Sequence, residues 1–95
     1  MRRLIRCNGT TLDFDAPLSI EEIEKLLGTE VVDSRLIDET HVMIFDDTFI
    51  DKRLPLNSTA TRIYHLAGFS IDQPILGDVY VCPDADFVKV GVIDD

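Results

Sequence analysis

The clearest helical segment of this sequence is only eight residues long, and that shortness limits the folds open to the chain. Apolar residues recur at helical spacing within residues 20–27. Ser19 stands three residues before Glu22, as in a capping box, and Gly28 follows as a helix terminator. The pattern predicts a helix over Ile20–Leu27. Because so short a helix is unstable alone in water, we expect it to pack against a sheet.

Two hairpins are predicted on either side of this helix. The runs Leu4–Cys7 and Thr10–Phe14 flank the pair Asn8 and Gly9, and this pair is typical of a type I′ turn. The β-branched run Val31–Ile37 is followed by a turn at Asp38 and Glu39 and then by the run His41–Phe45. Further strands are predicted over residues 49–53, 74–83 and 86–93.

These elements together predict an α+β fold. About six strands form a mainly antiparallel sheet, and two short helices pack on one of its faces. Residues 1–95 are expected to form a single domain, since the chain has the length of one domain and no linker or internal repeat divides it.

The second helical segment, residues 57–67, allows two interpretations. Ala60, Ile63 and Tyr64 recur at helical spacing, and Asn57 or Ser58 can cap the first turn. In the structural interpretation Asn57 is a cap, Ile63 and Tyr64 contribute to the core, and Arg62 and His65 face solvent. In the functional interpretation the side chains that bind a nucleotide-type ligand are Asn57, Arg62 and Tyr64, with Tyr stacking on a base and Arg pairing with a phosphate.

The charge balance restricts the partners of the protein. Eighteen acidic residues against nine basic ones give a net charge of −9. Such a charge repels nucleic-acid backbones and anionic membranes, and it attracts basic protein surfaces. A solubility role for the same acids is the alternative.

Acidic residues gather at the ends of the predicted elements, most clearly around the run His41–Phe45. An anionic face there can imitate a nucleic-acid backbone and occupy the basic channel of a nucleic-acid-handling protein. Exposed apolar groups near Phe45, Phe49 or Tyr80 would then add affinity. The predicted protein-binding residues are Asp38, Glu39, Asp46, Asp47 and Asp51.

No catalytic or cofactor-binding pattern accompanies these acids. The two histidines, His41 and His65, and the two cysteines, Cys7 and Cys82, show neither a nucleophile motif nor the spacing of a zinc site. The glycines stand singly, so no phosphate-binding loop is present. We therefore expect a protein without enzymatic activity, metal or cofactor.

The cysteine usage and the N-terminal sequence predict a cytoplasmic protein. Two cysteines far apart in sequence do not make a disulfide framework, which fits a reducing compartment. The apolar stretch before Arg6 is too short for a signal peptide, and no run approaches the length of a membrane span.

Three segments resemble a family of small phage- and plasmid-borne proteins described only as a domain of unknown function. They are LIDETHVMIFDD (residues 36–47), LPLNSTATRIY (54–64) and ILGDVYV (75–81). The resemblance covers about residues 19 to 82. The family often has Arg after the Asn of the second segment, whereas this chain has Ser58. The resemblance implies an α+β domain from a mobile element and attaches no activity to it. The expected location is then the cytoplasm of the bacterial host.

The leading hypothesis is therefore a non-catalytic phage or plasmid protein that inhibits a host nucleic-acid-handling or defence protein through its acidic surface. The nucleotide-binding interpretation of residues 57–67 is the alternative. A self-assembling protein is a third hypothesis, because unpaired edge strands favour homodimers.

Overall fold

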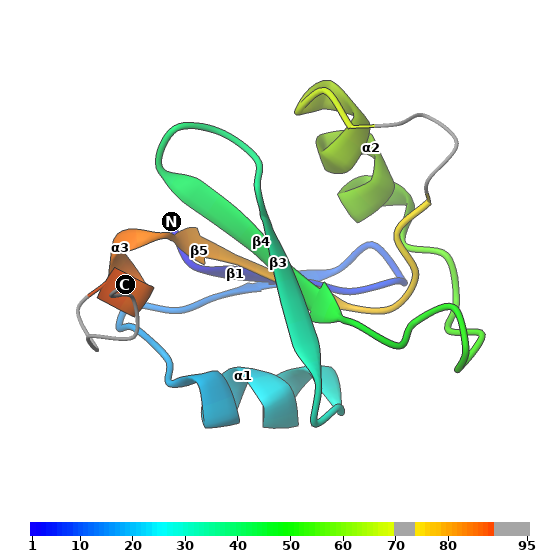
Figure 1. The fold of residues 1–95 in the computed structure, drawn as a ribbon, viewed down its shortest axis with the longest axis horizontal. Coiled ribbons are helices and arrows are strands. Elements are labelled where there is room, and N and C mark those ends of the chain that lie inside the picture. The colour runs from blue at the N-terminus through cyan, green and yellow to red at the C-terminus, as the bar shows by residue number, and fades with distance from the viewer. Residues whose placement is uncertain (70–73, 89–95) are drawn as a thin grey trace.

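The computed structural model describes residues 1–69 and 74–88, which form an antiparallel sheet between helices (Figure 1). The elements are β1 (Arg3–Ile5), β2 (Thr11–Asp13), α1 (Ile20–Leu27), β3 (Val32–Leu36), β4 (His41–Asp46), α2 (Ser58–Leu66), β5 (Val79–Pro83) and α3 (Ala85–Val88). The five strands follow the order β2-β1-β5-β4-β3. The predicted α+β class and antiparallel sheet are confirmed, with five strands in place of about six.

Strand β5 joins the two predicted hairpins into one sheet. It lies between β1 and β4, with Val79 opposite Ile5 and Tyr80 opposite Ile44. All of its pairings are antiparallel. The sheet therefore consists of two hairpins, each formed by strands that are neighbours in sequence, and a strand from near the C-terminal end that lies between them.

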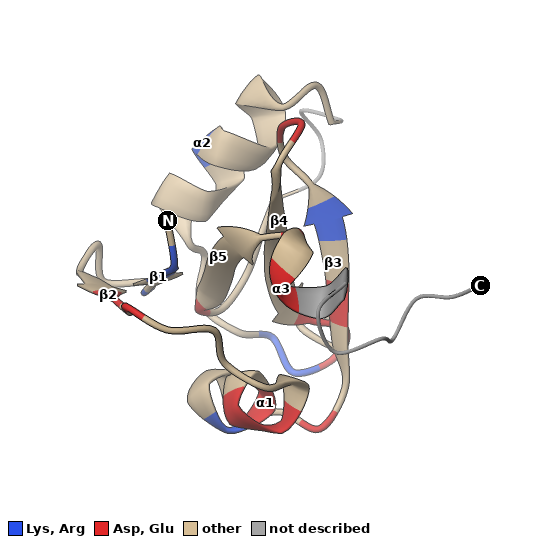
Figure 2. Ribbon diagram, turned by 90° about the vertical axis from the view of Figure 1, so that its left-hand side faces the viewer, with Lys and Arg blue, Asp and Glu red and all other residues tan. Residues whose placement is uncertain are grey.

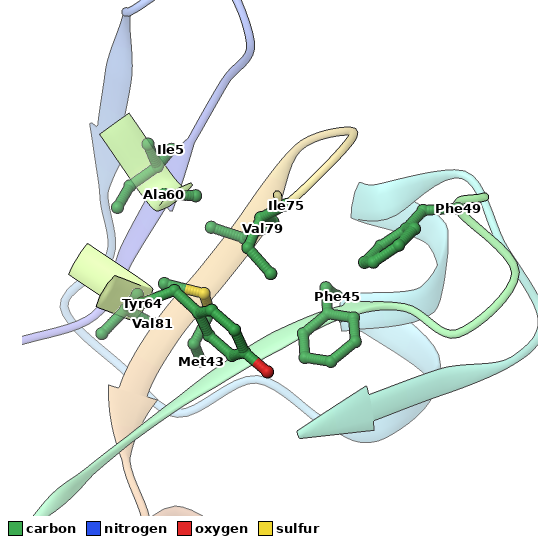
Figure 3. Packing of buried hydrophobic residues seen from close by; sticks show 9 residues of the cluster. All are labelled: Ile5, Met43, Phe45, Phe49, Ala60, Tyr64, Ile75, Val79 and Val81. Carbon is green, nitrogen blue, oxygen red and sulfur yellow. The ribbon is translucent and has the colours of Figure 1, made fainter. Parts of the chain in front are cut away.

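The helices cover opposite faces of the sheet, so the prediction that both pack on one face is wrong. Helix α1 buries Ile23 against the even-numbered residues of β4 and β5, such as Ile44 and Tyr80. Helix α2 packs on the other face, where its Tyr64 joins residues such as Val81 (Figure 3). The physical reason is that β4 and β5 are apolar on both faces, and each face needs a cover.

Both ends of α1 are formed as the sequence predicts. The Ser19 hydroxyl accepts a hydrogen bond from the Glu22 N–H at 3.1 Å, and the Glu22 carboxylate accepts one from the Ser19 N–H at 2.8 Å. Gly28 ends the helix in a left-handed conformation with φ 73°, which a residue without a side chain adopts at little cost. The capping-box interpretation is confirmed.

The first hairpin has a different turn from the predicted one. Gly9 has φ 89°, but Asn8 is not in the left-handed region, as the type I′ turn would require. Arg6 accepts a bond from the Gly9 N–H at 3.0 Å and donates one to the Thr10 carbonyl at 2.9 Å. The loop therefore has three residues rather than two, and the Asn8 side chain accepts the Thr10 N–H at 2.9 Å.

Of the remaining predicted strands, one is not observed and another lies mostly outside the described residues. Residues 49–53 form successive turns, in which the Lys52 N–H donates to Thr48 and the Leu54 N–H donates to Phe49. The start of the predicted strand 86–93 belongs instead to the single-turn helix α3, and residues 89–93 lie outside the described residues. The strand predicted over 74–83 begins only at Val79.

Candidate functional site

The five acidic residues predicted to bind a partner do not form one site. Asp38 and Glu39 lie at the tip of the β3–β4 hairpin, beyond the N-terminal end of β4. Asp46 is the last residue of β4, and Asp47 and Asp51 follow it in the loop at the opposite end. In Figure 2 the acidic hairpin tip lies beside α2, far from the acidic residues of α1.

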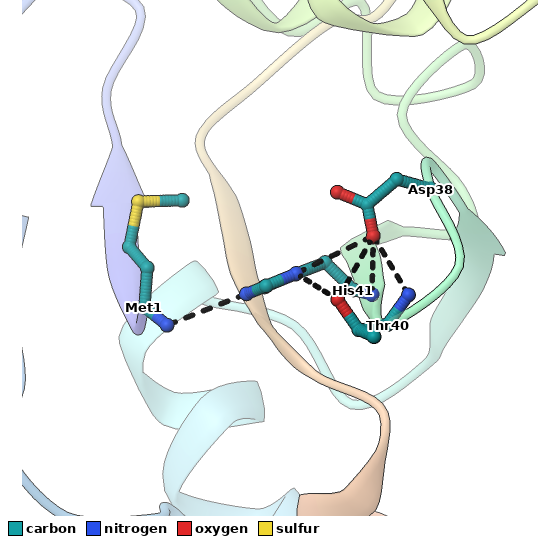
Figure 4. A network of polar contacts seen from close by, with 4 residues as sticks. All are labelled: Met1, Asp38, Thr40 and His41. Carbon is teal, nitrogen blue, oxygen red and sulfur yellow. Dashed lines mark hydrogen bonds and ion pairs between the residues drawn. The ribbon is translucent and has the colours of Figure 1, made fainter.

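Asp38 shapes the hairpin tip. One of its carboxylate oxygens accepts the N–H groups of Thr40 and His41, each at 2.8 Å (Figure 4). These bonds, led by the one from the Thr40 N–H, lower the pKa of Asp38 because they favour its charged form. The His41 ring continues the network, with Nδ1 2.8 Å from the Thr40 hydroxyl and Nε2 3.3 Å from the amino group of Met1. The Asp38 carboxylate thus acts mainly as a turn-forming group.

Asp46 does not present its charge at the surface, and its assignment to a binding surface is corrected. Its side chain is 3% exposed and lies 2.7 Å from the Lys52 ammonium. The same carboxylate accepts the N–H and the hydroxyl of Thr48 at 2.8 and 2.7 Å. Burial raises the pKa of Asp46, but the bonds from Lys52 and Thr48 outweigh burial, and the net shift is downward. Asp46 fixes the 47–53 loop to the sheet.

The predicted nucleotide site is not assembled. The Asn57 side chain has no exposure: its oxygen accepts the Ala60 N–H at 3.0 Å, and its nitrogen donates to Ile5 and Gly77 at 3.0 and 2.9 Å. Tyr64 is buried and stacks on Phe69 with ring centroids 4.4 Å apart. Arg62 is exposed on α2. The structural interpretation of this segment is confirmed for the Asn57 cap and for Tyr64 in the core.

The three aromatic residues near which we expect exposed apolar groups are themselves in the core. Phe45 and Phe49 are 6% and 7% exposed and contact each other on the α2 face, and Tyr80 is fully buried on the α1 face. Tyr80 packs edge-on against Phe14 at 5.7 Å. These three side chains hold the sheet to its covering elements, and exposed apolar surface near them comes from a neighbour, Ile50, which is 62% exposed.

Four acidic residues lie on α1 and the turn that follows it (Figure 2); Glu21, Glu22 and Glu30 are exposed, and Glu24 is half-buried. We call this region the α1 acidic surface and define it as Glu21, Glu22, Glu24 and Glu30. Among the described residues none of these four carboxylates forms an ion pair, and Lys25 is the only basic residue within 19–30. The helical period predicts this arrangement, because the apolar positions of α1 face the sheet and direct the glutamates outward.

A shallow hollow of about 510 Å³ adjoins the α1 acidic surface. Glu24 and Glu30 line it on one side, and Thr48 and Lys52 of the 47–53 loop line it on the other. Lys52 is already neutralised by Asp46 and also donates to the Thr29 hydroxyl at 3.3 Å. Lys25 also lines the hollow, so Glu24 and Glu30 leave an excess of one negative charge there. The hollow has space for a side chain from another molecule.

The two cysteine thiols, which are candidate nucleophilic side chains, are held in their unreactive protonated form. Burial raises the pKa of the Cys82 thiol to about 12 and also raises that of the half-buried Cys7 thiol, which lies close to Asp78. Both thiols are therefore protonated at neutral pH. Within residues 1–69 and 74–88, no group of three His, Cys, Asp or Glu side chains is placed to hold a metal ion. None of the described helices has the length and apolar character needed to cross a membrane.

Comparisons of the chain with protein families, with curated proteins and with solved structures gave no match. The mobile-element origin indicated by the three short segments therefore stays a prediction.

Proposed function

We propose that the protein is a non-catalytic binding protein whose α1 acidic surface occupies a basic surface on a partner protein. The observation that carries this proposal is a set of four carboxylates, three exposed and that of Glu24 half-buried, which form no ion pair among the described residues and lie beside an open hollow. A lysine or arginine of the partner would enter the hollow and meet Glu24 and Glu30. The other acids speed the encounter by long-range attraction.

The partner class follows from the same charges. Basic channels that hold phosphate backbones already display spaced positive charge, and an acidic protein that occupies them replaces the nucleic acid and its counterions. The resemblance to phage and plasmid proteins supports a mobile-element context, and within that context we propose a host nucleic-acid-handling or defence protein of the bacterial cytoplasm as the partner. On this proposal the protein acts as a stoichiometric inhibitor.

Displacement of DNA tests this proposal. A panel of purified bacterial nucleic-acid-binding proteins is loaded with a fluorescent duplex, and the protein is titrated into each complex. We expect displacement from at least one member at one-to-one stoichiometry, and weaker displacement at high salt because the contacts are ionic.

Two matched charge reversals locate the surface. The double variant Glu24→Lys, Glu30→Lys should weaken displacement at least about tenfold, since it reverses the charge of the hollow. The control Asp15→Lys, Glu39→Lys makes the same change in net charge at two exposed positions that do not line the hollow and should weaken displacement much less. Equal losses from both variants would show that only net charge matters, and a panel without any displacement would overturn the proposal.

A further inference from the structure

Strand β3 forms one edge of the sheet, and within the described residues no strand pairs with its outer side. Asp47 donates its N–H to the Val31 carbonyl and Ile37 donates to the His41 carbonyl, so the odd-numbered residues here bond toward β4. In an antiparallel pair the alternate residues then direct their N–H and C=O groups outward. For β3 these are Val32, Ser34 and Leu36.

The centre of this edge is covered by its own charged side chains. The Asp33 carboxylate accepts the Ser34 N–H at 2.8 Å, and the Arg35 guanidinium donates to the Ser34 carbonyl at 2.9 Å. Asp33 and Arg35 also bond to each other at 2.7 Å. We call this arrangement of Asp33, Ser34 and Arg35 the edge clasp. Both charged side chains are about 40% exposed, so they are free to exchange partners.

The sequence of β3 is complementary to itself in the antiparallel direction. When Ser34 of one copy lies opposite Ser34 of a second copy, Asp33 faces Arg35 and Arg35 faces Asp33. Val32 then faces Leu36, and the outward backbone groups of residues 32, 34 and 36 bond across the two-fold axis. Each ion pair of the edge clasp is replaced by one between the copies, so no charge loses its partner.

The apolar pairs fit the same register. Leu36 is 54% exposed, although its side chain lies on the α1 face of the sheet, on the side of the apolar core. Beside β3 on that face is a hollow of about 210 Å³ lined by residues that include Ile20, Val32 and Ile44. The two-fold pairing places Leu36 of one copy opposite Val32 of the other, next to this hollow. Its burial there contributes hydrophobic stabilisation.

From this complementarity we propose that the outer edge of β3 binds a second copy of the chain, forming a ten-stranded sheet centred on Ser34. This interface is separate from the α1 acidic surface, and its failure would leave the proposed function intact. The two also respond oppositely to salt. Two chains of charge −9 repel each other at long range, so salt should strengthen the dimer while it weakens contact with a basic partner.

Sedimentation velocity over protein concentrations from about 5 to about 500 μM tests the association. The expected mass rises from 10.7 kDa to twice that value, and the transition moves to lower concentration as salt increases. A single 10.7 kDa species over the whole range at both low and high salt would overturn the proposal.

Charge variants separate this dimer from a merely protective edge clasp. Arg35→Asp places like charges opposite each other twice and should raise the dissociation constant at least about tenfold, whereas Arg62→Asp makes the same charge change on α2 and should not. The double variant Asp33→Arg, Arg35→Asp restores complementarity and should restore the dimer. If the edge clasp serves only to block pairing, Arg35→Ala should associate more strongly than the wild type, which would contradict the proposal.

Cross-linking tests the register. In a Cys7→Ser background, Ser34→Cys should form a disulfide-linked dimer on mild oxidation, because equivalent residues at the two-fold axis are about 5.5 Å apart between Cα atoms. Leu36→Cys is the matched control, since residue 36 faces residue 32 and lies about 13 Å from its own equivalent. Equal cross-linking of both variants, or none of Ser34→Cys, would contradict the Ser34-centred register.

Discussion

Asn57 connects three parts of the molecule through one buried amide. It caps α2 through the Ala60 N–H, and it bonds to Ile5 in β1 and to Gly77 in the segment before β5. The backbone groups of Ile5, Ala60 and Gly77 are buried, so water cannot replace a hydrogen bond that Asn57 no longer makes. Asn57, which the sequence suggests as a ligand-binding residue, therefore contributes strongly to the stability of the fold.

Replacing Asn57 should accordingly be costly. We expect Asn57→Ala to lower the free energy of unfolding by about 2–4 kcal/mol, since it removes the cap and leaves two buried carbonyls without donors. Asn57→Ser keeps a capping oxygen and should fall between the wild type and Ala. Urea unfolding measures both, with Thr59→Ala on the exposed side of α2 as the control. A loss as small as that of Thr59→Ala would mean that the buried bonds contribute little.

Asp46 should make stability depend on acid pH. Its folded-state pKa lies below the value of about 3.9 for an unfolded Asp. The contribution of this group is therefore complete well above that value and is lost as the pH falls through the folded-state pKa. Asp46→Asn removes the titrating group, so the fall in stability below about pH 4 should become shallower than in the wild type. Unfolding midpoints between pH 2.5 and pH 7 make the comparison, and parallel curves would contradict it.

Among the elements, the two helices and two hairpins are predictable because their signals are local. The Ser19 and Glu22 capping box, the Asn57 cap and the turn at Asp38 each depend on residues within three positions of one another. The placement of the helices is not predictable from the sequence. The residues of β4 are apolar on both faces of the sheet, so they do not indicate which face each helix covers.

Burial of single carboxylates in the folded chain explains why the assignment of Asp46 to a binding surface is wrong. Asp46 and Asp47 are adjacent and identical in type, yet only Asp46 is drawn inward, by the Lys52 ammonium and by Thr48. Asp86 is likewise buried because it meets the Arg2 guanidinium at 2.8 Å from the far end of the chain. The Asp86 pairing depends on the completed sheet. The Asp46 contacts lie within six residues, but no pattern in the sequence distinguishes Asp46 from Asp47.

The α1 capping box supplies the test at the scale of an element. Ser19→Ala removes the oxygen that accepts the Glu22 N–H and should cost about 1 kcal/mol of unfolding free energy. Glu22→Gln keeps an acceptor for the Ser19 N–H and should cost only a few tenths of that, roughly 0.3 kcal/mol. Because α1 covers one face of the sheet, amide exchange in β4 should speed up in Ser19→Ala. Unchanged exchange would indicate that α1 is not coupled to the sheet.

At the scale of the whole molecule, the arrangement of charge determines how the protein responds to salt. Five of its acidic residues form ion pairs among the described residues, counting the contact of Asp38 with His41, and the net charge of −9 leaves repulsion in excess. The molecule measures 33 × 27 × 25 Å. At about 0.01 M salt the screening length is about 30 Å, so carboxylates on all sides repel one another, whereas at about 0.1 M it is about 10 Å and only neighbours interact.

Added salt should therefore stabilise the folded chain. We expect the urea midpoint to rise between about 0.01 and about 0.2 M NaCl and then to level off, because compaction concentrates like charges that salt screens. Glu24→Gln with Glu30→Gln removes two of these charges, so it should raise the midpoint at low salt and reduce the dependence on salt. Urea is the suitable denaturant because guanidinium itself screens, and a concentration below the onset of dimer formation isolates the effect. A midpoint that falls with salt would mean that the attractive ion pairs, such as Arg3 with Asp13, outweigh the repulsion among unpaired carboxylates.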